Sequence, residues 1–552
     1  MKLRLLLLIS LSIFFFRQGV IAQANFNTGN VHGNFEVNAQ LYSNDSVIEA
    51  PKVDEKMRMN AYLNLLYTNG GFTAGLRYEA YLNPMLGYDQ AYEGNGIPYR
   101  FINYKKDDLE VTVGNFYEQF GNGLILRTYE DKTIGIDNSL DGIRLKFEPI
   151  KGIAIKGLVG NQRYYWTRTK GLVRGVDAEI NFNDLIASFS GSKTHIIIGG
   201  SFVSKFQKDD PGSIYNLPQN VGASSARLDI SRGKFRLSGE YADKINDPTV
   251  LNNWIYKNGQ ALLLQTSYSQ KGLGISLSAK RIDNMNFRTD RAVTGSPLTL
   301  SYLPSLTKQQ AYSLATIYPY ATQPNGEMGF YGEILYKFKK GRKLGGHYGT
   351  DININLSEVN SLYKANPKDA DTIGMPGTLG YQSDFFKVGD QVYFKEFNIE
   401  ITHKFNKKFK SIFSYLNQVY NIDVIEGHPG DPMVYTNVAI ADLTYMLNET
   451  NALHAEIQGL WTKQDKGNWA QLLLEYSIAP TWSLTLMDQY NYGNPEKSKQ
   501  IHYFLGSFAY NKGTNRISVS WGRQRAGLLC VGGVCRSVPA SNGFQINITS
   551  SF

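Results

Sequence analysis

The chain divides into many segments of about ten residues in which apolar and polar side chains alternate. The first such segment, residues 34–41, places one set of side chains on each face, Phe35, Val37, Ala39 and Leu41 opposite Asn34, Glu36, Asn38 and Gln40. A period of two is that of a β-strand, and an apolar face opposite a polar one is expected where a strand separates lipid from a wet interior. We place 24 segments, near residues 34–41, 58–67, 72–81, 99–105, 109–117, 141–148, 153–161, 173–182, 194–206, 222–231, 235–243, 260–268, 273–282, 328–338, 347–357, 392–405, 409–419, 435–445, 452–462, 469–477, 482–490, 501–510, 516–525 and 543–552.

The links between these segments alternate in length along the chain. Short links such as Asn69-Gly70-Gly71 carry turn residues that tolerate positive φ. Between them lie long links, including 284–327 and 358–391. A membrane barrel has short turns at one rim and long loops at the other, whereas a β-sandwich or propeller gives no reason for such alternation. The sequence therefore predicts an all-β fold, a single transmembrane antiparallel β-barrel of about 24 strands (22 to 26), with long extracellular loops and short periplasmic turns.

The C-terminal segment, Gly543 to Phe552, is itself an alternating strand that ends on an aromatic residue. Phe544, Ile546 and Ile548 fall on the same face as Phe552, while Ser550 interrupts the apolar row. An edge strand of a soluble β domain would show the same pattern. After 23 earlier segments, we interpret it as the closing strand, paired with residues 34–41, and Phe552 as the signal for insertion into the membrane.

The N-terminus carries the pattern of an export signal. Lys2 and Arg4 precede an apolar run at residues 5–16, and a small-residue cleavage site follows near Ala22. The run is shorter than the ~20 residues of a spanning helix. We predict a signal peptide at 1–22, a short periplasmic segment at 23–33 and the barrel at 34–552. This leaves no room for an N-terminal plug domain, which argues against active uptake of the TonB-dependent type.

The chain has two cysteines, Cys530 and Cys535, separated by Val-Gly-Gly-Val. In an oxidising compartment such a pair closes a disulfide, and we place its loop on the outer surface. Free thiols or a metal site are the alternatives, but a metal site would need further cysteine or histidine nearby. The seven histidines are scattered without metal-ligand spacing, so no metal site and no cofactor are predicted.

The predicted inward face is polar and carries charges of both signs. The formal net charge of +9 falls to +6 when Lys2, Arg4 and Arg17 leave with the signal peptide. No basic run or aromatic platform suggests nucleic acid as a partner. The interspersed signs favour cross-strand ion pairs over a filter of a single sign. The predicted lumen-facing charges include Arg58, Arg77, Glu79, Arg227, Asp229, Arg236 and Glu240.

One stretch carries a family resemblance. Gly114-Asn-Phe-Tyr-Glu-Gln-Phe-Gly-Asn-Gly-Leu-Ile-Leu-Arg127, the residues that follow it to Phe147, and Gly199-Gly-Ser-Phe-Val-Ser204 resemble an uncharacterised family of outer-membrane β-barrel proteins from Bacteroidetes. The resemblance implies a barrel in the outer membrane of a Gram-negative cell. It implies no activity and no functional residues.

The same stretch is a candidate constriction segment. Its glycines would let the backbone fold closely inside a barrel, and its charges could line a pore. A strand extension with an extracellular turn is the alternative. The residues concerned are Gly121, Gly123, Arg127, Glu130, Asp131 and Lys132.

Two tripeptides in long links, Asp45-Ser46-Val47 and Asp371-Thr372-Ile373, are similar to the acceptor sequence of Bacteroidetes O-glycosylation. Both would lie outside the cell. The hydroxyls of Ser46 and Thr372 are the predicted attachment points.

These features favour a porin-like channel or transporter for an unknown solute. A non-conducting barrel subunit of an envelope secretion or assembly complex is the alternative. We expect no enzyme, because inward His454 beside Glu456 is the only acid–base pairing on the predicted wall, and such a histidine is more often structural. The expected partners are outer-membrane lipid and lipopolysaccharide, the barrel-assembly machinery and envelope proteins.

Overall fold

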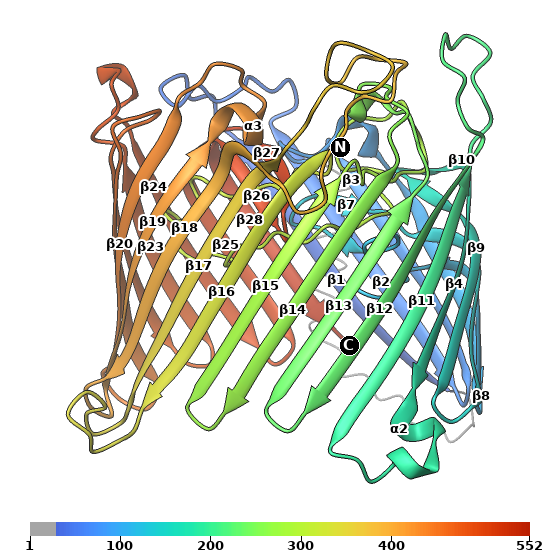
Figure 1. The fold of residues 1–552 in the computed structure, drawn as a ribbon. Coiled ribbons are helices and arrows are strands. Elements are labelled where there is room, and N and C mark those ends of the chain that lie inside the picture. Colours follow the sequence, from blue (N-terminus) through green and yellow to red (C-terminus); the bar gives the residue numbers. More distant parts are fainter. Residues whose placement is uncertain (1–28) are drawn as a thin grey trace.

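A computed structural model describes residues 29–552 and contains a closed barrel of 24 antiparallel strands (Figure 1). The predicted all-β barrel and its strand count are confirmed, and the predicted signal peptide lies outside the described residues. Two short hairpins, β6–β7 and β26–β27, stand apart from the barrel. The barrel strands are β1 (Asn30–Tyr42), β2 (Met57–Asn69), β3 (Phe72–Leu82), β4 (Gly94–Lys106), β5 (Leu109–Phe116), β8 (Leu140–Ile150), β9 (Ile153–Tyr164), β10 (Thr167–Asn181), β11 (Thr194–Phe206), β12 (Asn220–Arg232), β13 (Phe235–Lys244), β14 (Gly259–Gln270), β15 (Leu273–Asp283), β16 (Gly326–Phe338), β17 (Thr350–Leu362), β18 (Val388–Lys404), β19 (Phe409–Asn421), β20 (Met433–Met446), β21 (Asn451–Trp461), β22 (Trp469–Ile478), β23 (Trp482–Tyr490), β24 (His502–Lys512), β25 (Asn515–Gln524) and β28 (Ser541–Ser551).

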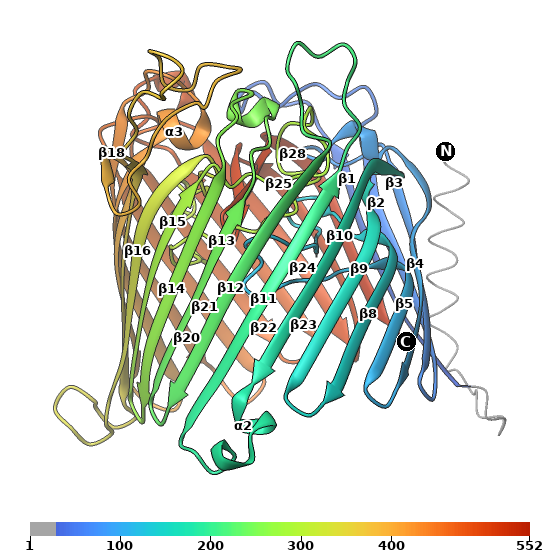
Figure 2. The ribbon, with the colours of Figure 1, turned by 45° about the vertical axis from the view of Figure 1, so that its right-hand side comes forward.

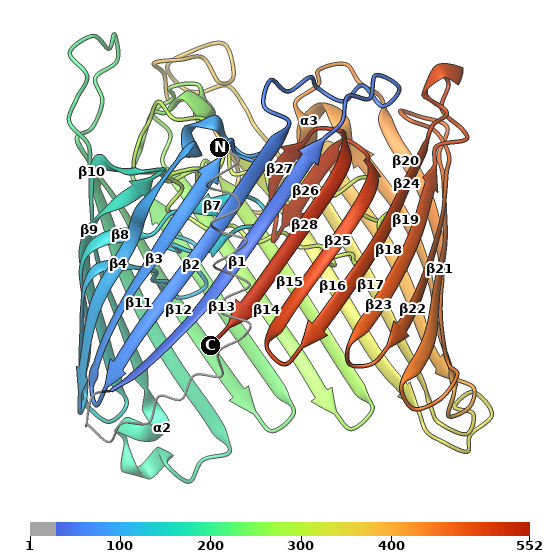
Figure 3. The ribbon, with the colours of Figure 1, turned by 180° about the vertical axis from the view of Figure 1, so that it is seen from behind.

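The last strand closes the barrel, as Figure 3 shows where β1 and β28 run side by side. Leu41 lies opposite Phe544 and Val37 opposite Ile548, so the predicted pairing of the first and last strands is confirmed. Strand β1 begins at Asn30, which pairs with Thr68 of β2. The predicted N-terminal segment is therefore too long by four residues, since Asn30 to Gly33 are part of the wall.

The two rims of the barrel differ, as Figure 2 shows. The long-loop rim carries the links that follow β1, β3, β5 and then each odd-numbered strand from β9 to β25. The short-turn rim carries the other links of the barrel. There are three clear exceptions: β9 and β10 meet in a two-residue turn at the long-loop rim, residues 182–193 hold helices at the short-turn rim, and residues 339–349 form a longer link between β16 and β17 at that same rim. In the described part of the chain, the helices are η1 (Gln90–Tyr92), α2 (Phe182–Leu185), η2 (Ala187–Phe189), η3 (Val250–Asn252), α3 (Ile422–Glu426) and η4 (Lys497–Lys499). No helix within residues 29–552 has the length and apolar character needed to cross a membrane.

The outer face of the wall is apolar. Many large aliphatic and aromatic residues point outward and are exposed, among them Leu264, Leu277, Phe330, Leu472 and Leu484, at 42–54 %. The residues that alternate with them point inward, because successive side chains of a strand face opposite ways. Beside Leu264, for example, Leu263 is 2 % exposed and belongs to a buried cluster inside the barrel.

Candidate functional site

Two long links and one hairpin of the long-loop rim turn into the barrel. We call residues 117–139, between β5 and β8, the first inward segment, and residues 284–325, between β15 and β16, the second inward segment. The hairpin consists of β26 (Gly527–Val531) and β27 (Val534–Val538), and we call it the disulfide hairpin. Figures 1 and 3 both show β7 and β26–β27 between the walls, in the half of the barrel next to the long-loop rim. These elements narrow the lumen on that side.

The first inward segment is held by an apolar patch on the inner wall. Its side chains Phe120, Leu124, Ile125 and Leu126 are at most 1 % exposed. They belong to one cluster with inward residues of the wall, including Val173, Val203, Val221, Ala242, Ala261 and Ile282. This patch would be costly if it faced water, so burying it against the segment stabilises the inward conformation.

Glycines bring the tip of this segment against the wall. Gly121 and Gly123 adopt φ angles of 52° and 91°, which side chains disfavour. A Cβ atom on Gly121 would lie 2.6 Å from the Glu240 carboxylate. Between the glycines, the backbone N–H and the side-chain amide of Asn122 donate to that carboxylate at 2.6 and 2.9 Å. The predicted lumen charge Glu240 is therefore an anchor of the segment.

A buried ion cluster holds the returning half of the segment. Arg77 and Arg163 are 4 % and 3 % exposed, and both bind Glu79 of the wall at 2.7 Å. Asp137 of the segment accepts from both arginines, at 2.6 Å from Arg163 Nη1. Glu130 adds a contact of 2.8 Å to Arg77 Nη1. Sequence reasoning missed Arg163, because the predicted strand ended at residue 161.

The segment contributes two acids to this cluster, Asp137 and Glu130, and their pKa values are shifted in opposite directions. Burial by itself would raise the pKa of Asp137, but the positive charges of Arg163 and Arg77 outweigh it and leave that pKa below its ordinary value of 3.8. For Glu130, burial outweighs Arg77, so its pKa is raised. Asp137 is thus the carboxylate that the arginines hold ionised.

The other predicted residues of the first segment also make contacts inside the barrel. The guanidinium group of Arg127 lies over the ring of Tyr302, with its Cζ 3.8 Å from the ring centroid. Lys132 Nζ binds Glu36 of β1 at 2.7 Å. Asp131 instead accepts from Thr133 within its own turn, at 2.8 Å.

The second inward segment extends the obstruction to the opposite wall. Its first part joins the first segment through backbone bonds from Arg127 N to Leu300 O, at 2.8 Å, and from Tyr302 N to Gly123 O, at 2.9 Å. Its later part packs Leu314, Tyr318 and Tyr320 against inward side chains of β17 to β22. The two segments therefore form one hydrogen-bonded unit that spans the lumen.

A second buried ion cluster lies beside this unit. Asp247 is fully buried and binds Lys205 Nζ at 2.6 Å and Arg291 Nε at 3.0 Å. Lys244 Nζ donates to the backbone oxygen of Asn286, at 2.9 Å, in the second inward segment. Burial favours the neutral acid, yet Lys205, Lys244 and Arg291 lower the pKa of Asp247.

Cys530 and Cys535 are joined by a disulfide, but their hairpin does not lie on the outer surface as expected. Gly532 O and Gly533 O accept from Ser305 N and Thr322 N of the second segment, at 3.4 and 3.0 Å. Here too glycine permits the approach, since a Cβ atom on Gly532 would lie 2.2 Å from the Tyr302 hydroxyl. The hairpin turns inward because its tip has no side chains.

The same hairpin reaches the first inward segment. Arg536 Nη2 donates to Thr133 O at 2.9 Å, and the guanidinium of Arg536 lies 4.2 Å from the ring centroid of Tyr88. The disulfide hairpin thus links both inward segments.

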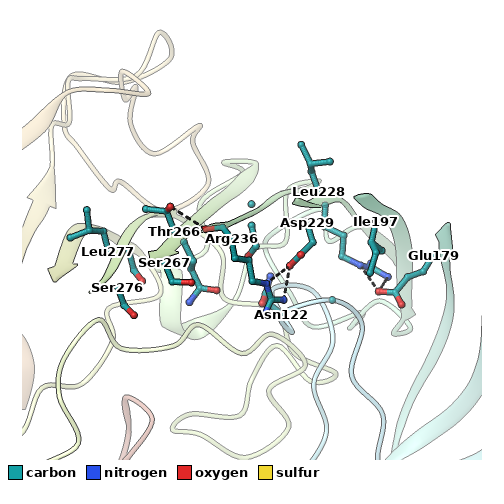
Figure 4. A pocket seen from close by; sticks show the side chains of 16 residues that line it. Asn122, Glu179, Ile197, Leu228, Asp229, Arg236, Thr266, Ser267, Ser276 and Leu277 are labelled. Atoms are coloured by element: carbon teal, nitrogen blue, oxygen red, sulfur yellow. Dashed lines mark hydrogen bonds and ion pairs between the residues drawn. The ribbon is translucent and has the colours of Figure 1, made fainter. Parts of the chain in front are cut away.

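A polar cavity of about 570 Å³ opens beside the tip of the first segment, between Asn122 and the wall of β10 to β15 (Figure 4). Its charges are paired across strands: Arg227 binds Glu179 at 2.9 Å, and Arg236 binds Asp229 at 2.6 Å. The lining also includes the inward hydroxyl and amide side chains of Ser238, Gln265, Ser267, Ser276 and Ser278, and residues Ile197, Leu228, Thr266 and Leu277 of the same strands border it. The cavity therefore offers many hydrogen-bonding groups and little unpaired charge.

The remaining predicted residues lie outside this site. Arg58 Nη1 donates to Pro84 O at 2.9 Å, near the long-loop rim. The backbone of Phe552 pairs with that of Gly33, and its side chain is 55 % exposed on the outside. Ser46 and Thr372 are exposed in long links, although Asp45 is buried against Arg523, 2.6 Å away.

Comparison with known sequences identifies the family. A sequence model of a protein family, described as a family of unknown function (DUF6029), matches residues 1–552. The chain belongs to this family. The predicted membership of an uncharacterised family is confirmed, whereas the Bacteroidetes origin stays a prediction. No curated protein matches the sequence.

Solved structures of similar shape include three barrels. A mutant of the ferric enterobactin receptor PfeA from Pseudomonas aeruginosa is 10 % identical, with 95 % of this chain and 81 % of that chain covered and a TM-score of 0.43. Acinetobacter baumannii OccAB3 is 10 % identical, with 95 % and 99 % covered and a TM-score of 0.36. The Pseudomonas aeruginosa outer membrane protein OpdK is 10 % identical, with 83 % and 99 % covered and a TM-score of 0.33.

Proposed function

We propose that the chain is an outer-membrane channel or transporter for small polar solutes, gated by its two inward segments and its disulfide hairpin. The observation that carries the proposal is the pair of inward segments docked across a wide barrel. An empty barrel of 16 to 18 strands already leaves an aqueous channel, so one of 24 strands needs such an obstruction if passage is to be controlled. The inward segments take the place of a plug domain.

The apolar outer face supports a membrane location. Side chains such as Leu264 and Leu277 would be unfavourable against water, at about 25 cal/mol for each Å² of apolar surface, and are stable against lipid. We place the long-loop rim outside the cell and the short-turn rim in the periplasm, as in other barrels with this asymmetry. Lipid, lipopolysaccharide and the barrel-assembly machinery are then the partners, with Phe552 as the insertion signal.

The lining of the cavity indicates which class of solute the barrel would conduct. Because Arg227 and Arg236 are paired with Glu179 and Asp229, the lining presents no strong field of one sign. Its hydroxyl and amide groups exchange hydrogen bonds with a solute, as water does. We therefore assign uncharged or zwitterionic polar solutes to this path, and no cofactor and no chemical reaction.

Liposomes test this assignment. Vesicles that contain the purified protein should swell in solutions of small neutral sugars or amino acids, and swell more slowly as solute size rises. Planar bilayers with the inserted protein should show current. Correct insertion without swelling or current would refute the channel, and stoichiometric copurifying proteins would then favour a non-conducting subunit of an envelope complex.

A further inference from the structure

Three side chains with metal-binding chemistry meet on the inner wall of β20 and β21. Asp442 lies opposite Glu456 in the strand register, and His454 is two residues before Glu456, so all three share the inward face. His454 Nε2 is 3.0 Å from Asp442 Oδ1 and 3.8 Å from Glu456 Oε1. Each residue offers one ligand atom, and these atoms lie within 4.8 Å of one another.

The two distances from His454 Nε2 are close to those between neighbouring ligands of one ion. Zinc binds imidazole nitrogen and carboxylate oxygen at about 2.0–2.2 Å, so neighbouring ligand atoms stand roughly 2.9 Å apart at right angles and about 3.3 Å apart in a tetrahedron. The two distances from Nε2 lie on either side of the tetrahedral value. Small rotations of Asp442 and Glu456 would equalise them.

The charge at this place is unbalanced. Within residues 29–552, the ion pairs of Asp442 and Glu456 run to His454 and to no lysine or arginine. A third carboxylate, Glu475, lies opposite His454 in the register. By contrast, Glu400 on the same inner surface is paired with a basic residue, since Lys308 Nζ lies 3.1 Å from its carboxylate. A divalent cation would neutralise the excess negative charge of the cluster.

Neighbouring donors fix the outer oxygen of each carboxylate. The Tyr312 hydroxyl donates to Asp442 Oδ2 at 3.0 Å, and Gln458 Nε2 donates to Glu456 Oε2 at 2.9 Å. The other oxygen of each acid is thereby left directed at His454 Nε2. Hydrogen bonds of this kind to the far atom of a ligand are what orients side chains around bound metals.

We propose that Asp442, His454 and Glu456 bind a divalent transition-metal ion of the Zn²⁺ or Mn²⁺ class. One imidazole and two carboxylates are a ligand set for such ions, with further positions left to water. The three side chains are 15 %, 26 % and 18 % exposed, so the ion enters from the lumen. Because Tyr312 belongs to the second inward segment, the ion sits where that segment meets the wall.

Equilibrium dialysis of the tag-free, metal-stripped protein against Zn²⁺ and against Mn²⁺, with metal counted by mass spectrometry, tests the site. We expect one ion per folded chain for at least one of the two metals. His454→Gln and Glu456→Gln should each weaken binding at least tenfold, and Tyr312→Phe should weaken it roughly tenfold through the lost orienting bond. His502→Gln is the matched control, because His502 pairs with the single carboxylate of Asp488 at 2.7 Å and should leave binding unchanged.

A second measurement separates loss of ligands from loss of folding. The visible spectrum of bound Co²⁺ should change in His454→Gln, while the heat-dependent gel mobility of the barrel stays that of the native protein. Absence of a stoichiometric ion, native affinity in His454→Gln, or an equal loss in His502→Gln would each overturn the proposal.

Discussion

Asp137→Asn should release the first inward segment from the wall. Asp137 accepts from two buried arginines, and each hydrogen bond to a charged group contributes about 1.5–3 kcal/mol. Both arginines remain paired with Glu79, and the asparagine side chain keeps one acceptor oxygen. We therefore expect the docked conformation to lose about 2–3 kcal/mol of stability, which is less than the roughly 3–5 kcal/mol lost when a buried ion pair is broken completely. At 1.36 kcal/mol for each factor of ten, the docked-to-released ratio falls roughly 30- to 150-fold.

Single-channel recording in planar bilayers measures this shift. The Asp137→Asn protein should spend a larger share of time at high conductance than the native protein. Asp351→Asn is the control, because Asp351 pairs with Lys337 at 2.7 Å where both side chains are about half exposed, and such pairs contribute about 0–1 kcal/mol. Equal open times in Asp137→Asn and the native protein would refute the anchoring role of Asp137.

Two further predictions concern the hairpin and the membrane face. Reduction of the disulfide, or Cys530→Ser with Cys535→Ser, should loosen the hairpin that links both inward segments and raise the conductance; an unchanged current in fully reduced protein would contradict this. Leu277→Arg on the outer face should cost about 2–4 kcal/mol of barrel stability in lipid, measured by urea unfolding, while Ser276→Arg on the inner face should cost less. A reversed order would show that the two faces have been misassigned.

The wall could be predicted from the sequence because its pattern is local. Alternation within ten residues is enough to define a strand such as 34–41, and the alternating links fix which rim each turn joins. Strand ends were less certain, since pairing across the wall extends β1 to Asn30 and β9 to Tyr164. The extension of β9 is what brings Arg163 to Asp137.

The site depends on contacts between residues far apart, which alternation does not reveal. The sequence left two conformations open for the first inward segment, and the choice between them depends on the apolar patch that receives it. A signal was present: Val173, Val203 and Ala242 are apolar at inward positions that a wet lumen would leave polar. The inward turn of the disulfide hairpin likewise depends on residues 302–322, more than 200 positions earlier in the chain.

Removal of the first inward segment tests the gating account most directly. Phe116 and Leu140 pair at the ends of β5 and β8, so a short Gly-Ser linker in place of residues 119–136 would leave the wall intact. Planar-bilayer recordings should show a conductance several times that of the native protein, together with faster entry of larger neutral sugars into liposomes. A correctly folded, inserted variant with native conductance would contradict the proposal that this segment limits passage.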